Sequence, residues 1–172
     1  MAEFPSPTLP ITSRGEVFAT YLEYFRSGVI ARVEGLSDVE IRSSRLASGW
    51  TPLELLRHLR FVEMRWLEWG FEGQSVEDPW GDHRDGRWYV GEDETRDDVI
   101  GELRAQGFRT RKIIRAYDLD TVAQPGPRFK EGGEVPTLER ILFHVFQEYA
   151  RHLGHLGHLD VVAELAGGPT GE

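Results

Sequence analysis

Four long segments with the apolar period of an α-helix constrain the fold of this chain more than any other feature. In each segment apolar residues recur every three or four positions, a spacing that places them on one face of a helix. No pair of strands is apparent in the sequence. The segments span residues 13–36, 51–73, 95–117 and 136–165, and each begins at a hydroxyl residue that can cap a helix: Ser13, Thr51, Thr95 and Thr137. The pattern predicts an all-α four-helix bundle.

The first two segments carry the clearest start signals. Ser13 is followed three positions later by Glu16, and Thr51 is followed by Pro52 and then Glu54. A hydroxyl residue with Glu three positions on forms a capping box, and proline suits the first position of a helix. We therefore expect helices to begin directly after Ser13 and Thr51, and we expect Trp66 and Trp69 of the second segment to lie in the core.

The connections between the segments are long. Residues 74–94 are acidic, and a loop of this length is sufficient for an overhead crossover between bundle helices. Residues 121–134 are compatible with a short hairpin, and residues 1–12 with an extended arm, within a single domain over residues 1–172. The first of these loops also carries aromatic residues that we expect to anchor it: Trp80, Trp88 and Tyr89.

Composition excludes several classes of protein. The 172 residues include no cysteine, which excludes disulfides, thiolate metal sites and a cysteine nucleophile, and favours a cytoplasmic location. A net charge of −9 argues against nucleic-acid binding, and no apolar run is long enough for a membrane span. We expect a small-molecule substrate, and a homodimer because aromatic residues are abundant on one face of the first segment: Phe18, Tyr21 and Phe25.

A carboxylate on an apolar helix face is the chemical anomaly of the sequence. Glu148 and His152 are four positions apart, so they lie one above the other on the apolar face of the last segment. His58 shares the apolar face of the second segment. Two histidines and a glutamate are the ligand set of catalytic zinc sites, and they also suit Ni(II), Fe(II) or Mn(II). The pattern predicts one divalent metal ion at His58, Glu148 and His152.

The residues also leave other assignments open. A carboxylate on an apolar face can instead be held by an arginine or be protonated, and the candidate arginines are Arg57, Arg60 and Arg151. The remaining histidines have weaker claims. His155 is one turn past His152, where it could be a ligand in a shifted register, and His144 could hydrogen-bond Glu148. His158 is expected near solvent, and His83 has no partner at ligand spacing.

Two segments resemble the DinB-like superfamily of bacterial four-helix bundles. Residues 49–63, GWTPLELLRHLRFVE, are similar to the second-helix pattern, in which a Trp-Thr start leads to a metal-ligand histidine. Residues 138–155 resemble the fourth-helix pattern with a Glu-x-x-x-His-x-Gly-His core. The resemblance covers roughly residues 16–167 and assigns the superfamily's metal ligands to His58, Glu148 and His152.

The version of the motif with glutamate is similar to the branch of mycothiol-dependent maleylpyruvate isomerase. This resemblance implies a metal-dependent transferase or isomerase that uses a low-molecular-weight thiol such as mycothiol or bacillithiol. One departure is a repeated Gly-His-Leu at residues 154–159, which also permits a register with His155 and His158 aligned as ligands. The alternatives are a metal-assisted hydrolase with Glu63, Asp160 or an unliganded histidine as base, and a non-catalytic dimerisation or binding module with a vestigial site.

Overall fold

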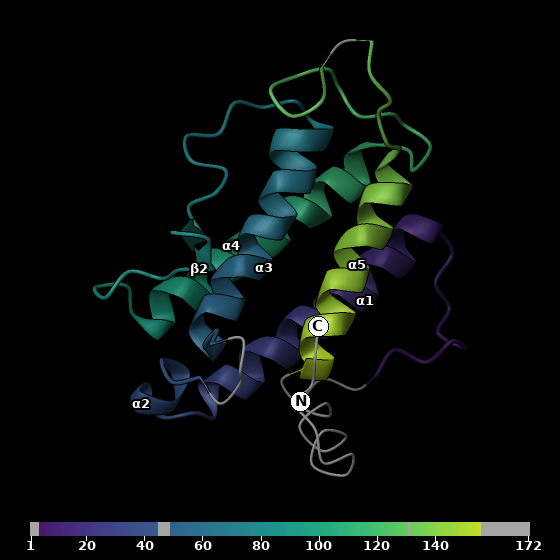
Figure 1. Cartoon of the computed structure of the whole chain (residues 1–172). Helices are drawn as coiled ribbons and strands as arrows, with labels where there is room; N and C mark the ends of the chain where they lie inside the picture. Colours follow the sequence, from purple (N-terminus) through teal and green to yellow (C-terminus); the bar gives the residue numbers. More distant parts are fainter. Residues whose placement is uncertain (1–3, 45–48, 131, 156–172) are drawn as a thin grey trace, which may run out of the picture.

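The computed structural model describes residues 4–44, 49–130 and 132–155, and in this part of the chain helices are the main elements, joined by long loops (Figure 1). The long helices are α1 (Arg14–Glu34), α3 (Pro52–Trp66), α4 (Arg96–Ala116) and α5 (Leu138–His155). The shorter elements are α2 (Asp38–Ile41), the π-helix η1 (Leu67–Phe71) and the hairpin strands β1 (His83–Arg84) and β2 (Arg87–Trp88). The predicted all-α four-helix bundle is confirmed.

The helix starts lie where the sequence predicts them. The Ser13 hydroxyl accepts from the backbone N–H of Glu16, and Thr51 forms a complete capping box with Glu54. Thr95 caps α4 in the same way. These caps satisfy backbone donors that have no partner within the helix. The continuation of the last predicted helix beyond His155 lies outside the described residues.

Each long helix packs mainly against two neighbours, because α1 and α3 both contact α4 and α5, and a smaller contact joins α1 to α3. The helices α3 and α5 are antiparallel, since His58 lies beside His152 and Trp66 lies beside His144. By contrast α3 and α4 run in the same direction, as the pairs Arg60–Glu102 and Glu68–Gln106 indicate. The chain between these parallel neighbours therefore has to return along the bundle, and this return carries the hairpin past α3.

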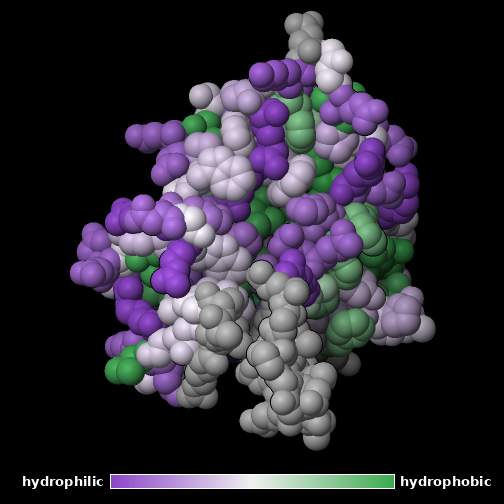
Figure 2. Space-filling model, viewed as in Figure 1, coloured by the Kyte–Doolittle hydropathy of each residue, from purple (hydrophilic) through white to green (hydrophobic). Residues whose placement is uncertain are grey.

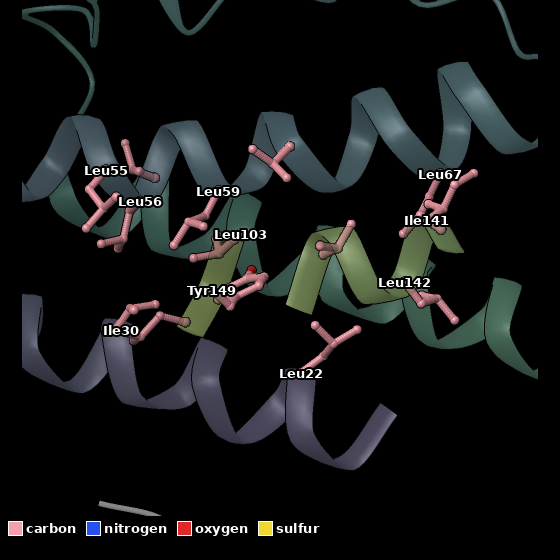
Figure 3. Close-up of a cluster of buried hydrophobic side chains, with 14 of the residues drawn as sticks. Leu22, Ile30, Leu55, Leu56, Leu59, Leu67, Leu103, Ile141, Leu142 and Tyr149 are labelled. Atoms are coloured by element: carbon pink, nitrogen blue, oxygen red, sulfur yellow. The ribbon is translucent and has the colours of Figure 1, made fainter. Parts of the chain in front are cut away.

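The core is formed by one face of each long helix (Figure 3). Buried side chains from different helices meet in it, including Leu22, Leu59, Leu103 and Tyr149. Two side chains at apolar positions of the predicted helices are exposed instead: Val17 is 41% exposed and Tyr117 is 40% exposed. None of the helices within the described residues combines the length and apolar character needed to cross a membrane.

The last turns of the second predicted helix differ from the expectation of one helix with both tryptophans in its core face. The α-helix ends at Trp66 and continues as η1, whose wider turn changes which side chains face inward. Leu67 and Phe71 are buried there, whereas Trp69 is only partly buried. Trp66 packs against the core from its edge. The prediction that Trp69 is a core residue is therefore wrong.

The hairpin also lies in a different loop from the one expected. It occupies residues 83–88, where Asp85 and Gly86 adopt positive φ angles of 53° and 74°. Two such residues in succession form the tight turn that suits the twist of a two-stranded hairpin. Within the described residues of the loop at 121–134, the only strand-like pairing is a single bridge from Val122 to Thr137.

Candidate metal centre

His58, Glu148 and His152 come together between α3 and α5. Each residue offers one ligand atom, and these atoms lie within 4.8 Å of one another. The Oε2 atom of Glu148 is 3.2 Å from His152 Nε2 and 3.9 Å from His58 Nε2. Ligands of a tetrahedral metal at about 2.0–2.1 Å are about 3.4 Å apart. The three donor atoms, two imidazole nitrogens and one carboxylate oxygen, therefore suit a divalent cation.

The electrostatics of these residues favour the forms that bind a metal. The hydrogen bond with His152 and the nearby imidazole of His58 hold the pKa of the Glu148 carboxyl well below its usual range, although partial burial opposes this shift. Burial lowers the pKa of His152, and the hydrogen bond to Glu148 offsets only part of that effect. An ionised carboxylate next to a neutral imidazole is the protonation state that coordination requires.

Asp82 and Trp88, which come from the return between α3 and α4, position His58. Asp82 Oδ2 lies 3.0 Å from His58 Nδ1, on the opposite side of the ring from Glu148. The indole of Trp88 stacks on the imidazole at 4.1 Å between ring centroids, with an angle of 14° between the planes. A carboxylate that accepts Nδ1–H fixes the tautomer in which Nε2 is free for a metal.

Asp82 is itself held rigidly. Its side chain is fully buried, and both of its oxygens accept from Arg65, at 2.6 Å and 3.1 Å. His83 Nδ1 lies 2.8 Å from Oδ1. Burial raises the pKa of the Asp82 carboxyl, but the bonds with His58, Arg65 and His83 outweigh it and bring the pKa well below its usual range. Asp82 is therefore a permanent anion behind His58.

A second group of possible ligands, His58 with Asp82 and His83, is equally compact. There, however, the carboxylate oxygens are already engaged by the two bonds from Arg65. Glu148 has no such arginine among the described residues, where its ion-pair partners are His58, His144 and His152. The group with Glu148 is therefore the better candidate for a metal.

The arginine alternative for Glu148 finds no support among the described residues. Arg57 binds Glu94 and Arg60 lies beside Glu102, while Arg151 is exposed. The expected burial of Glu148 is also wrong, since its side chain is 22% exposed. It lies at the edge of the apolar face rather than within it, so burial alone does not require a cation there.

Besides Asp82, the other fully buried carboxylate of the described residues is Glu63, which the sequence offered as a base for hydrolysis. Its Oε1 accepts from Arg26 Nη2 at 2.8 Å and from the Tyr149 hydroxyl, and its Oε2 accepts from Thr110. Glu63 is therefore saturated in the core and cannot act on a substrate. The other offered base, Asp160, lies outside the described residues, as do His158 and the side chain of His155.

Sequence reasoning missed the role of the return loop. It expected Trp88 only as a loop anchor and gave His83 no partner, whereas Trp88 stacks on His58 and His83 contacts Asp82. The one available signal was an aspartate next to a histidine in a loop long enough to pass α3. His144 lies one turn from Glu148, but its Nε2 is 3.7 Å from Glu148 Oε1, too far for the hydrogen bond that the sequence suggested.

The bundle and its group of histidines with a glutamate place the chain in the DinB-like superfamily. Within it, the chain belongs to the mycothiol-S-transferase family, whose sequence pattern matches residues 17–167. Among solved structures, the chain is similar to YfiT from Bacillus subtilis, described as a probable metal-dependent hydrolase with an unusual four-helix bundle topology. The identity is 16% and the TM-score 0.60, over 95% of this chain and 94% of YfiT. No curated protein sequence matches the chain.

Proposed function

We propose that the protein is a metal-dependent enzyme that joins a low-molecular-weight thiol of the mycothiol type to an electrophilic substrate, or uses the thiol to isomerise one. The observation that carries the proposal is the convergence of His58, Glu148 and His152 within 4.8 Å in a member of the mycothiol-S-transferase family. The proposed metal is zinc, nickel, iron or manganese, and the proposed location is the cytoplasm.

Three side chains would hold the metal, and the coordination positions that they leave open would admit the thiol. His58 and His152 present nitrogens, Glu148 presents an oxygen, and three protein ligands leave room for exchangeable ones. A bound divalent cation lowers the pKa of a coordinated thiol, so that it is deprotonated at neutral pH. Because the chain has no cysteine, the thiol has to be a co-substrate. In transfer, the thiolate sulfur forms a bond to carbon and the leaving group departs with its electron pair.

The first experiment measures metal and activity together. Protein purified without a histidine tag is assayed by elemental analysis, and for chloride release from 1-chloro-2,4-dinitrobenzene in the presence of mycothiol. We expect about one metal ion per chain and thiol-dependent release. His58→Ala, Glu148→Ala and His152→Ala should each lose metal and activity, whereas His83→Ala should keep the metal. Full metal retention in the first three variants would contradict the site, and metal without activity would favour a binding module.

The register of the last ligand is tested separately. His152 is the histidine that the structure brings to Glu148, and we propose it as the ligand. The shifted register, with His155 and His158 aligned, makes the opposite prediction. In that case His158→Ala would strip the metal and His152→Ala would spare it.

Metal-assisted hydrolysis is the second candidate function. The description of YfiT favours it, and so does His144, an imidazole without a proposed ligand role whose Nε2 lies 3.7 Å from Glu148. In this case His144 would take a proton from the attacking water. Turnover of ester or amide substrates without thiol, lost in His144→Gln with metal content unchanged, would establish hydrolysis in place of thiol transfer.

Dimerisation stays a prediction, but part of the aromatic face of α1 that suggested it is covered within the chain. Tyr21 is covered by Phe4 and Phe146, so the aromatic face of α1 is partly used within the chain. Apolar residues still gather where α1 and α5 lie (Figure 2), with Val17 41% and Phe143 54% exposed. We propose that two copies meet there. Light scattering at micromolar concentration should give twice the chain mass, and Phe143→Glu should give the monomer.

A further inference from the structure

Arg128 stands out because it is half-buried and has no anionic partner within residues 4–44, 49–130 and 132–155. Its guanidinium carbon lies 4.1 Å from the ring centroid of Trp66 and 5.1 Å from that of Trp69. Its Nε atom is buried and has no hydrogen-bond partner among the described residues. The other buried or half-buried arginines of the described residues each have a carboxylate or carbonyl partner: Arg26, Arg32, Arg57, Arg60, Arg65, Arg96 and Arg111.

The loop that carries Arg128 is held by backbone contacts that do not involve the guanidinium. The N–H of Gln124 donates to the carbonyl of Phe71 at 2.8 Å, which ties the loop to η1. A Cβ on Gly126 would come within 2.8 Å of the Gly73 Cα, so the backbones of the two segments are in direct contact. Because the loop is held without it, the guanidinium is available for another purpose.

Arg128 lies at one end of a continuous row of side chains that leads to the proposed metal ligands. The Trp66 ring on which it stacks also contacts the His144 ring, at 4.5 Å between centroids. His144 in turn faces Glu148 at 3.7 Å. Along α3, Trp66 is eight residues from His58, which corresponds to about 12 Å. A molecule that reacts at the metal ligands can therefore extend along this row to Arg128.

The charge at this end of the row suits an anion. Burial and the nearby charge of Arg65 lower the pKa of Arg128, and no carboxylate among its described neighbours opposes the shift. Arg65 is committed to Asp82, so it contributes positive potential without competing for a ligand. A guanidinium held flat on aromatic rings presents its N–H groups in a plane, the geometry that binds a carboxylate with two hydrogen bonds.

We propose that Arg128, stacked on Trp66 and Trp69, binds a carboxylate of the substrate that accepts the thiol. The role of this substrate as the thiol acceptor rests on the proposed function. Binding of its carboxylate to Arg128 needs neither metal nor thiol. The substrate class is an organic acid long enough for its electrophilic carbon to reach the proposed metal ligands while its carboxylate binds Arg128.

Binding is tested first on metal-free protein, so that it does not depend on the reaction. The probes are 4-chloro-3,5-dinitrobenzoate and its methyl ester, followed by quenching of tryptophan fluorescence. We expect the acid to bind at least tenfold more tightly than the ester, a factor that corresponds to about 1.4 kcal/mol. Arg128→Gln should abolish this preference, and Arg128→Lys should retain only part of it. Equal binding of acid and ester by the unsubstituted protein would overturn the proposal.

The matched control is Arg84→Gln, because Arg84 stacks on Tyr89 at 3.7 Å but is exposed on the hairpin. This variant should keep the preference for the acid, and an equal loss in both variants would overturn the proposal. If Arg128→Gln does not fold, the acid-to-ester ratio of the unsubstituted protein and of Arg128→Lys decides the matter. With metal and mycothiol present, Arg128→Gln should raise KM for the acid alone. A failure of thiol transfer with intact acid binding would remove the proposed function and leave the anion site standing.

Discussion

At the scale of single residues, Asp82 matters most outside the proposed ligands. It accepts from His58 Nδ1 while Arg65 keeps it ionised and immobile. We expect Asp82→Asn to weaken metal affinity about 10- to 100-fold, the usual cost of losing a carboxylate behind a ligand histidine. Competition with a chromogenic chelator measures this. Asp78→Asn in the same loop is the control and should leave affinity unchanged, while an unaltered affinity in Asp82→Asn would show that the carboxylate does not orient His58.

The protonation of the proposed ligands gives a second prediction at this scale. The Glu148 pKa is lowered by its hydrogen bond with His152 and by the nearby His58, so the carboxylate stays ionised well into acid. Coordination by a histidine requires the neutral ring, whose ordinary pKa is about 6.5 and is lowered by burial in His152. Metal should therefore be held at pH 7 and released as the pH falls below about 6, since protons then compete for imidazole. Dialysis across a pH series measures this, and release centred near pH 4 would implicate a carboxylate instead.

The residue scale also separates what sequence can predict from what it cannot. Glu148 and His152 could be paired in advance because four positions on one helix fix their proximity. Asp82 and Trp88 could not be placed near His58, because their position depends on the path of a loop across α3. The position of Arg128 is even less predictable, because the residues around it come from a loop and from a π-helix that the apolar pattern does not indicate.

At the scale of elements, a buried polar network joins all four long helices. Arg26 of α1 binds Glu63 of α3, which also accepts from Thr110 of α4 and Tyr149 of α5. Burial together with the Glu63 charge raises the pKa of Tyr149, so its hydroxyl keeps the proton that it donates. Since Tyr149 follows Glu148 directly, the network also fixes the register in which α5 presents its ligand to α3.

Gly107 explains how this network fits between the helices. A Cβ at this position would lie 2.4 Å from the Arg26 guanidinium carbon, so a side chain there would displace the arginine. By sequence alone, Gly107 only weakens the helix, and Arg26 interrupts the apolar face of α1. Capping signals could be recognised because they are local, whereas this pairing of a gap on α4 with an arginine on α1 arises only when the helices pack.

The network predicts a large loss of stability when one member is changed. Glu63→Gln keeps the shape of the side chain but removes the buried countercharge of the Arg26 guanidinium, which is only 3% exposed and retains only the partly exposed Glu23 as an ion-pair partner. Breaking a buried pair by removing one partner costs about 3–5 kcal/mol. Urea unfolding should show a loss of this size. Glu102→Gln, which removes a partly exposed pair with Arg60, should cost less than about 1 kcal/mol. Similar midpoints for the two variants would mean that the network adds nothing to stability.

At the scale of the whole molecule, the number of helices follows from the sequence but their arrangement does not. Apolar period and caps identify each helix separately, yet they do not say that α3 and α4 run in the same direction. That arrangement sends the chain back along the bundle and brings Asp82 to α3. The proposed function depends on this arrangement of the helices. The proposed ligands come from two antiparallel helices, and the Asp82 carboxylate that orients His58 comes from the loop between α3 and α4.

A bound metal should therefore stabilise the whole bundle, because it links α3 to α5 at the Glu148 position. A ligand present at 100 times its dissociation constant stabilises the folded state by about 2.7 kcal/mol. For a chain of 172 residues this corresponds to a rise in Tm of about 5–10 °C over the metal-free protein. Thermal unfolding followed by circular dichroism, with and without chelator, measures the difference. Glu148→Gln should unfold at a temperature that the chelator does not change. An equal response to chelator in the variant would place the stabilising metal elsewhere in the protein.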